Sequence, residues 1–217
     1  MKKIIIAIGL ILLPLNCFAF SVGVVSDIHA GSKKTRMEQG GLSIVYPSKA
    51  VSYFEKAVQQ MKAKGVDLIV VLGDIVQDNS KKNYPKLKKI EQTYGIKVLW
   101  VMGNHDNANN FKKYFGSDDY TYETNGIKFV VKNVSTCDSD NCSIGDVPSG
   151  DIILQHEPPL IRYTCDWKQG FDAEKDLTIW AGHWHMEKTC GNVRIFPALT
   201  EHRKLNYQII NLDKSGI

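Results

Sequence analysis

Carboxylate, imidazole and amide side chains gather in short clusters along the chain, each at the end of an apolar run. The clusters are Asp27 with His29, Asp74, Asn104 with His105 and Asp106, His156, and His183 with His185. Such a set, without cysteine, suits manganese, zinc or iron better than calcium. It has more groups than one ion needs. We therefore expect two metal ions ~3.5–4 Å apart, bridged by one carboxylate, an arrangement that clamps phosphoryl oxygens.

Each of these residues also has a structural interpretation when it is taken singly. An aspartate or asparagine at a strand end can be a turn or cap residue, and a lone histidine can be a hydrogen-bonded core residue. Five of the six histidines nevertheless fall in the clusters, and only His202 lies elsewhere. This coincidence favours a shared site over separate structural roles.

Five β-rich apolar runs precede the clusters and are expected to position them. They span residues 21–27, 66–74, 96–104, 151–156 and 177–183. Because the runs are continuous rather than alternating, they predict strands covered on both faces, as in layered α/β folds. The carboxyl ends of such strands form the binding crevice, so side chains far apart in sequence should meet there.

Helical patterns between the first three runs predict the covering layers. Ser48 is expected to cap a helix that ends at Gly65, and residues 84–95 carry a second amphipathic pattern with lysines on its polar face. This β-α-β-α-β order predicts parallel strands with right-handed crossovers. The second half is richer in strands and includes a hairpin signal at Asn125-Gly126.

Taken together, the motifs resemble the calcineurin-like metallophosphoesterase family in order and spacing. They are Asp-Ile-His (27–29), Gly-Asp (73–74), Gly-Asn-His-Asp (103–106), His156 and Gly-His-Trp-His (182–185). The resemblance covers essentially the whole chain after residue 19. It implies an α/β fold, a four-layer α-β-β-α sandwich with mixed sheets, and a dinuclear metal centre that hydrolyses phosphoric esters.

The resemblance also implies roles for individual residues. The ligands of one metal would be Asp27, His29, Asp74 and His185; those of the other would be Asp74, Asn104, His156 and His183. The catalytic residues would be His105, which faces the substrate, and Asp106, which orients it. Gln77 departs from the family pattern, because an acidic residue or a tyrosine often stands there. This argues against a tyrosinate-iron centre and leaves manganese, zinc and ferrous iron open.

The expected reaction is hydrolysis of a small-molecule phosphate ester by a metal-bound hydroxide, with His105 stabilising charge on the leaving group. One alternative is an exonuclease or nucleotide phosphodiesterase, which would need a basic groove. Without residues 1–19 the formal charge falls from +4 to +2, since Lys2 and Lys3 are lost. A nucleic-acid partner is therefore not indicated. Another alternative is a metal-dependent binding module without turnover.

The first 19 residues have the pattern of a secretory signal peptide: Met1-Lys2-Lys3, an apolar run and a small-residue exit at Ala19. The run is too short to span a bilayer, so we expect no stable membrane anchor once it is removed. The remainder, 20–217, has the length of a single domain. We expect an exported, periplasmic or secreted enzyme; its oligomeric state is not predicted.

The four cysteines after the leader form an even set, which in an exported chain predicts disulfides. The expected pairs are Cys137–Cys142 and Cys165–Cys190, the nearest in sequence. The alternatives are free thiols or a zinc site, although the spacings lack two C-x-x-C knuckles.

Overall fold

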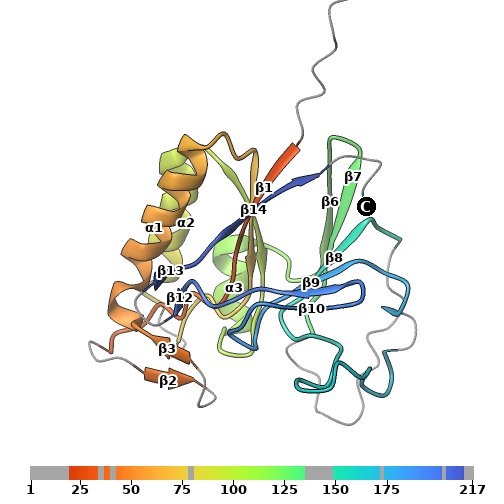
Figure 1. Ribbon diagram of the computed structural model, residues 1–217. Coiled ribbons are helices and arrows are strands. Elements are labelled where there is room, and N and C mark those ends of the chain that lie inside the picture. Colours follow the sequence, from red (N-terminus) through yellow and green to blue (C-terminus); the bar gives the residue numbers. More distant parts are fainter. Residues whose placement is uncertain are drawn as a thin grey trace, which may run out of the picture.

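The computed structural model describes residues 20–33, 37–39, 43–77, 81–134, 149–171, 174–201 and 204–212. Two mixed β-sheets lie face to face, and three helices cover the outer face of one of them (Figure 1). The predicted α/β fold with two mixed sheets is confirmed.

The first sheet has the strand order β14-β1-β4-β5. The strands β1 (Phe20–Val25), β4 (Leu68–Leu72) and β5 (Lys97–Val101) are parallel, and β14 (Gln208–Leu212) runs antiparallel beside β1. All five residues of β4 are buried. This two-sided burial explains the continuous apolar runs in the sequence.

The helices α1 (Pro47–Ala63), α2 (Tyr84–Tyr94) and α3 (Ala108–Phe115) cover this sheet (Figure 1). Ser48 does not cap α1: Tyr46 takes the N-cap position, and Pro47 opens the first turn. Proline is favoured there because its fixed φ suits a helix start and its missing N–H needs no partner. The lysines of α2 face solvent, apart from the half-buried Lys88, as the amphipathic pattern predicts.

The second sheet has the order β10-β11-β9-β8-β7-β6. Its strands are β6 (Tyr120–Thr124), β7 (Ile127–Val131), β8 (Ile152–Leu154), β9 (Ile179–Ala181), β10 (Lys188–Cys190) and β11 (Val193–Ile195). The β6–β7 hairpin turns at Asn125 and Gly126, whose φ angles are 48° and 72°. Two positive φ values are typical of the predicted tight turn.

Two short ladders complete the strands: β2 (Met37–Gln39) pairs with β3 (Ser43–Val45), and β12 (Thr200–Glu201) pairs with β13 (Lys204–Leu205).

Loop side chains pack on the outer face of the second sheet. Val130, Ile153 and Ile179 on this face pack against Leu160, Trp167 and Trp184. In the parts of the chain that the structure describes, no α-helix covers this face. The connection from β8 to β9 contains Pro158-Pro159, which lack N–H donors and disfavour a helix.

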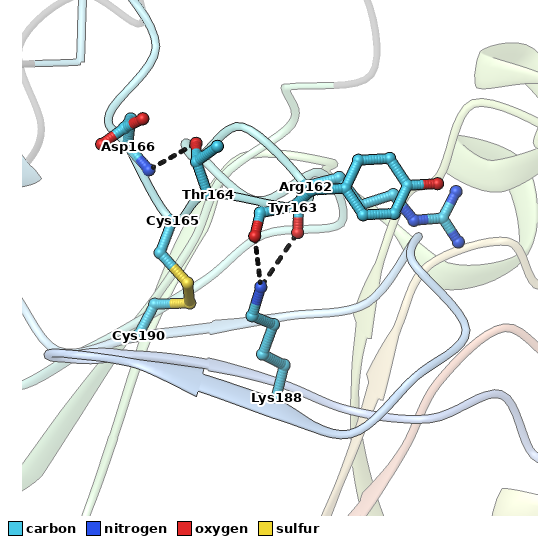
Figure 2. Close-up of a disulfide and its surroundings, with 7 residues drawn as sticks. All are labelled: Arg162, Tyr163, Thr164, Cys165, Asp166, Lys188 and Cys190. Atoms are coloured by element: carbon cyan, nitrogen blue, oxygen red, sulfur yellow. Dashed lines mark hydrogen bonds between the residues drawn. A yellow bond between two sulfur atoms is a disulfide. The ribbon is translucent and has the colours of Figure 1, made fainter.

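Cys165 and Cys190 form a disulfide with a Cα–Cα distance of 5.8 Å, which confirms this predicted pair (Figure 2). The predicted leader, Cys137–Cys142 and His202 lie outside the described residues. Within the described ranges, no helix has the length and hydrophobicity to span a membrane.

Candidate metal centre

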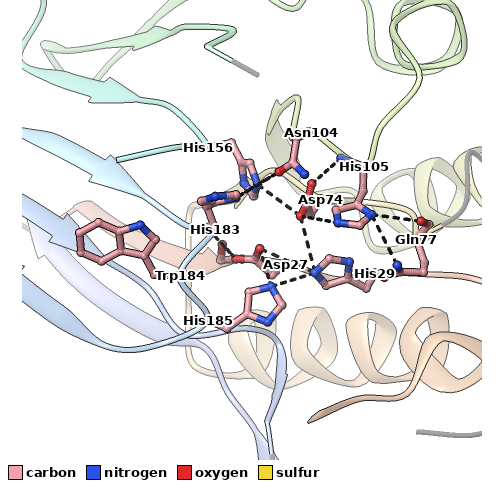
Figure 3. A network of polar contacts seen from close by, with 12 residues as sticks. Asp27, His29, Asp74, Gln77, Asn104, His105, His156, His183, Trp184 and His185 are labelled. Atoms are coloured by element: carbon pink, nitrogen blue, oxygen red, sulfur yellow. Dashed lines mark hydrogen bonds and ion pairs between the residues drawn. The ribbon is translucent and has the colours of Figure 1, made fainter. Parts of the chain in front are cut away.

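The strand ends of both sheets meet at one site (Figure 3). The first sheet supplies Asp27 and His29 after β1, Asp74 after β4 and Asn104 with His105 after β5. The second sheet supplies His156 after β8, and His183 and His185 after β9. All seven predicted ligand residues therefore come together.

The first ligand group contains Asp27, His29, Asp74 and His185, and all four are buried. Their ligand atoms lie within 4.8 Å of one another. His29 Nε2 is 3.6 Å from Asp74 Oδ2 and 2.9 Å from His185 Nε2. These donor atoms converge on a small volume, as a coordination shell requires.

The second ligand group contains Asp74, His156 and His183, joined by the amide of Asn104. Asn104 Oδ1 is 3.1 Å from both His156 Nε2 and His183 Nδ1. His156 Nδ1 donates to the carbonyl of Leu72 at 2.9 Å, so its Nε2 is the atom that faces the group. Such a hydrogen bond fixes the tautomer of a ligand histidine.

Asp74 belongs to both groups. Its Oδ2 lies 3.6 Å from His29 Nε2 and 3.3 Å from His156 Nε2. Its Oδ1 accepts a hydrogen bond from the backbone N–H of His105 at 2.9 Å, which fixes the carboxylate between the groups. This is the geometry expected of a bridging ligand.

The backbone is held in an unusual conformation at most ligands. Asp27, His29, Asp74, His183 and His185 all have φ between 47° and 65°. Non-glycine residues rarely adopt this region, and strain of this kind concentrates at functional sites. Backbone hydrogen bonds sustain it: the His29 N–H donates to the Asp74 carbonyl at 2.8 Å.

The turns that follow β4 and β5 pack closely against each other. A Cβ at Gly103 would therefore overlap the backbone and carboxylate of Asp74. Only glycine fits at that position of the Gly-Asn-His-Asp motif.

The electrostatics of the site suit two cations. Although burial raises the pKa of Asp74, the nearby histidines, above all His156, hold it well below its usual range. Burial lowers the pKa of His29 and of His183 to about 4, so both imidazoles are neutral and can offer lone pairs at neutral pH. Burial would also lower the pKa of His156, but the Asp74 carboxylate raises it to about 10.

The Asp27 carboxylate points to the same need for positive charge. Asp27 is fully buried, and the groups nearest its Oδ1 are His185 Nε2 at 3.1 Å and His29 Nε2 at 3.8 Å. Buried carboxylates need a compensating charge, and a metal ion supplies one. The residues present therefore fit a pair of divalent ions.

His105 lies beside both groups without joining either. Its Nδ1 is 3.2 Å from the backbone carbonyl oxygen of Gln77, while its Nε2 is 4.0 Å from Asp74 Oδ2 (Figure 3). The Gln77 carbonyl can only accept, so the Nδ1–H donates to it. The Nε2 atom is then free to face a substrate.

The predicted pairing of Asp106 with His105 is wrong. Asp106 accepts hydrogen bonds from the backbone N–H groups of Ile75, Val76 and Gly103, at 2.9–3.1 Å. Burial, with the Asp74 charge, raises its pKa to about 7. Asp106 joins the turns after β4 and β5. The backbone carbonyl of Gln77, rather than Asp106, orients the His105 imidazole.

Two supporting residues were not found from the sequence. Tyr84 donates to Asp106 Oδ1 at 3.1 Å and accepts from the N–H of Asn107 at 3.0 Å. Ser26 contacts the Asp27 carboxylate and lies 3.1 Å from the Leu72 carbonyl. Ser26 directly precedes a ligand and could have been considered, whereas nothing in the sequence near Tyr84 connects it to the site.

Comparison with known proteins shows to which family this chain belongs. The profile of the calcineurin-like phosphoesterases matches residues 20–187, which is most of the chain and includes every ligand described above. The chain belongs to this family. It is a metallophosphoesterase with a His/Asp cluster suited to two metal ions.

Curated relatives are similar over different shares of their length. A probable cyclic nucleotide phosphodiesterase of Fibrobacter succinogenes is 25% identical over 77% of this chain and 73% of its own. A probable glycerophosphodiester phosphodiesterase of Arcobacter nitrofigilis is 30% identical, but over 31% of this chain and 24% of its own. The match thus spans about a quarter of the length of the Arcobacter nitrofigilis protein.

Solved structures share the fold. A dimetal phosphatase from Danio rerio superposes with a TM-score of 0.66 at 15% identity, covering 90% of this chain and 93% of the other. A Thermus thermophilus protein gives a TM-score of 0.55 at 12% identity, covering 89% of this chain and 99% of the other. At such identities the likeness concerns the fold alone.

Proposed function

We propose that this chain hydrolyses phosphoric esters with two divalent metal ions, of manganese, zinc or iron, bound at the two ligand groups. The observation that carries the proposal is the position of Asp74 Oδ2, within 3.6 Å of donor atoms from both groups. Residues at the strand ends of both sheets are needed to build this arrangement, so a single turn could not produce it by chance.

Under this proposal the ligands divide as the groups do. Asp27, His29 and His185 hold the first ion; Asn104, His156 and His183 hold the second; Asp74 bridges them. When bound, two such ions lower the pKa of a coordinated water and offset charge on phosphoryl oxygens.

Residues of the protein determine from which side the ester approaches and which group can protonate the leaving group. The first group is fully buried, while Asn104 is exposed and His183 half-buried at the second. The ester therefore reaches the site from the second group. His105, held at Nδ1 by the backbone carbonyl of Gln77, presents Nε2 beside Asp74; when the ring is an imidazolium, the Nε2 proton can pass to the leaving group, which leaves the neutral ring with its Nδ1–H.

The substrate class is proposed from the relatives. Their printed names include cyclic nucleotide and glycerophosphodiester phosphodiesterases, so we propose a small phosphodiester, with cyclic nucleotides as the first candidates. The helix α2 covers the outer face of the first sheet (Figure 1), and its exposed lysines face solvent on the side away from the sheet. This favours a small ester over an extended nucleic acid.

The test is a metal-reconstituted assay. The protein is stripped with a chelator, reloaded with Mn²⁺, Zn²⁺ or Fe²⁺, and given nitrophenyl phosphate, bis(nitrophenyl) phosphate, cyclic AMP and single-stranded DNA. We expect metal-dependent turnover of the small diesters. Turnover of DNA alone would support the exonuclease alternative, and bound metal without turnover would support the binding module.

We also propose that the protein is exported after cleavage at Ala19. The leader pattern supports this, as does the Cys165–Cys190 disulfide, since disulfides persist mainly outside the cytosol. Sequencing the amino terminus of the expressed protein tests it: the mature chain should begin at Phe20, and an uncleaved cytosolic chain would refute it.

A further inference from the structure

A cleft of about 500 Å³ opens beside the second ligand group, and the ligand His183 is one of its lining residues. The other lining side chains are Leu160, Ile161, Arg162, Trp167, Lys168, Gln169 and Trp184. The volume lies in the range of sites for organic ligands, roughly 300–1,000 Å³, and far exceeds what a phosphate needs.

The lining combines flat apolar faces with positive charge. Trp184 points away from the metal ligands between which it stands, and Trp167 is half-buried (Figure 3). Arg162 is held at the cleft by donating from Nη2 to the Trp184 carbonyl at 2.8 Å. Lys168 lines the cleft together with the candidate ligand His183. Indole faces stack on planar rings, and the cations attract an anionic ester.

The wall of the cleft is fixed in place (Figure 2). The segment 160–167 folds back on itself, with Leu160 and Trp167 paired in an antiparallel bridge. Cys165 in this segment is bonded to Cys190 of β10, and Lys188 Nζ donates to the carbonyls of Arg162 and Tyr163 at 3.1 and 3.3 Å. A wall held at two points is ordered before a ligand arrives, which favours selective binding.

We propose that this cleft is the subsite for the organic group of the substrate and selects phosphoesters that carry a planar ring of nucleobase size. The proposal rests on the proposed function, because it places the phosphorus at the metal pair. An ester that reaches the second ion at His183 has its organic group beside the cleft. A small polyol group would leave the half-buried Trp167 uncovered, whereas a nucleobase can stack on its indole; Trp184 is only 4% exposed and forms the floor against the second sheet.

The test compares two five-membered cyclic diesters, adenosine 2′,3′-cyclic phosphate and glycerol 1,2-cyclic phosphate, in kcat/KM with Mn²⁺-loaded protein. We expect the wild type to prefer the adenosine ester. Trp167→Leu keeps an apolar side chain in the wall and should lower the ratio of the two kcat/KM values about tenfold or more, the effect of losing one stacking platform. Tyr163→Phe is the control: Tyr163 belongs to the same segment, is 75% exposed and does not line the cleft, and the change keeps its ring beside Arg162. It should leave the ratio unchanged.

Binding to the wild type provides a measurement that needs neither variant nor turnover. Calorimetry on the Mn²⁺-loaded protein should show AMP binding at least about tenfold more tightly than ribose 5-phosphate, again the contribution of one stacked base. Equal affinity for the two, or equal loss on both esters in Trp167→Leu, would overturn the subsite. Failure of the proposed function looks different: the wild type would hydrolyse no ester with any metal, whatever the calorimetry shows.

Discussion

At the scale of single residues, His105 occupies a position distinct from the metal ligands that surround it. Its Nδ1 donates to the Gln77 carbonyl, and its Nε2 faces the site 4.0 Å from the nearest Asp74 oxygen. A residue in this position can act on the substrate without holding an ion, so its substitution should separate chemistry from metal binding.

His105→Asn should therefore keep its metal and its fold but lose roughly 10²–10⁴ in kcat, the range for general acid catalysis. The loss should be smaller with nitrophenyl esters, whose leaving group needs little protonation. Steady-state kinetics on alkyl and aryl esters, with metal analysis of the same samples, measure both effects. Wild-type rates on alkyl esters, or loss of the metal, would show that His105 has another role.

Tyr84 supports the site from behind through Asp106. Tyr84→Phe removes a donor to Asp106 and an acceptor for the Asn107 N–H. We expect the free energy of unfolding to fall by about 1–2 kcal/mol, since the Asn107 N–H loses its acceptor while Asp106 Oδ1 keeps only the Val76 N–H. Urea unfolding measures this. Tyr94→Phe is the control, because Tyr94 bonds an exposed glutamate, Glu55, at 3.4 Å and its loss should cost less than half as much. Equal effects of the two changes would argue against a supporting role for Tyr84.

The sequence was sufficient to predict which side chains meet at the site, since each of the seven candidate ligands stands after an apolar run that forms a strand. It was not sufficient for Asp106, because the direction of a side chain within a turn depends on the neighbouring turn. Here the Gly-Asp turn after β4 presents the N–H groups of Ile75 and Val76, and Asp106 binds these rather than the imidazole.

At the scale of elements, the Cys165–Cys190 disulfide ties the connection after β8 to β10. Replacing both cysteines with alanine should lower the free energy of unfolding by about 3 kcal/mol for a closed loop of this length, if chain entropy dominates. Denaturant unfolding of the oxidised protein and the variant gives the difference. An unchanged midpoint would mean that the bridge does not stabilise the fold.

The elements themselves were predicted unevenly. The parallel strands and the Asn125-Gly126 hairpin could be predicted from the sequence, because two-sided burial and turn formation both leave local patterns of residue types. The start of α1 was misplaced by two residues, with Ser48 expected as the N-cap instead of Tyr46, since Ser48 is the better cap by residue type. The helical layer that the resemblance implied outside the second sheet stays a prediction, because among the described residues the loop that contains Pro158-Pro159 packs there.

At the scale of the whole molecule, buried acids with raised pKa values make stability depend on pH, and Glu174 is one that lies outside the metal centre. Glu174 is fully buried, and burial raises its pKa to about 7, an effect that Gln155 and Lys132 offset only in part. The folded protein then keeps a proton that the unfolded chain releases above about pH 4.5. The free energy of unfolding should therefore decrease between pH 4.5 and 7, by up to ~3 kcal/mol.

Glu174→Gln should flatten this dependence, because the amide does not titrate. The measurement is urea unfolding of metal-loaded protein at several pH values, taken as the difference between variant and wild type. Glu123→Gln, on the exposed edge strand β6, is the control and should keep the wild-type profile. Parallel profiles for Glu174→Gln and wild type would contradict the assignment.

The central claim is that two metal ions share Asp74, and metal stoichiometry tests it most directly. Elemental analysis after saturation with Mn²⁺ and gel filtration should find two ions per wild-type chain. Asp74→Asn should bind neither, because its amide cannot supply the bridging charge that both groups require. Asp119→Asn, at a surface ion pair with Lys132, should still bind two. One ion or none in the saturated wild type, or two ions retained by Asp74→Asn, would contradict the account.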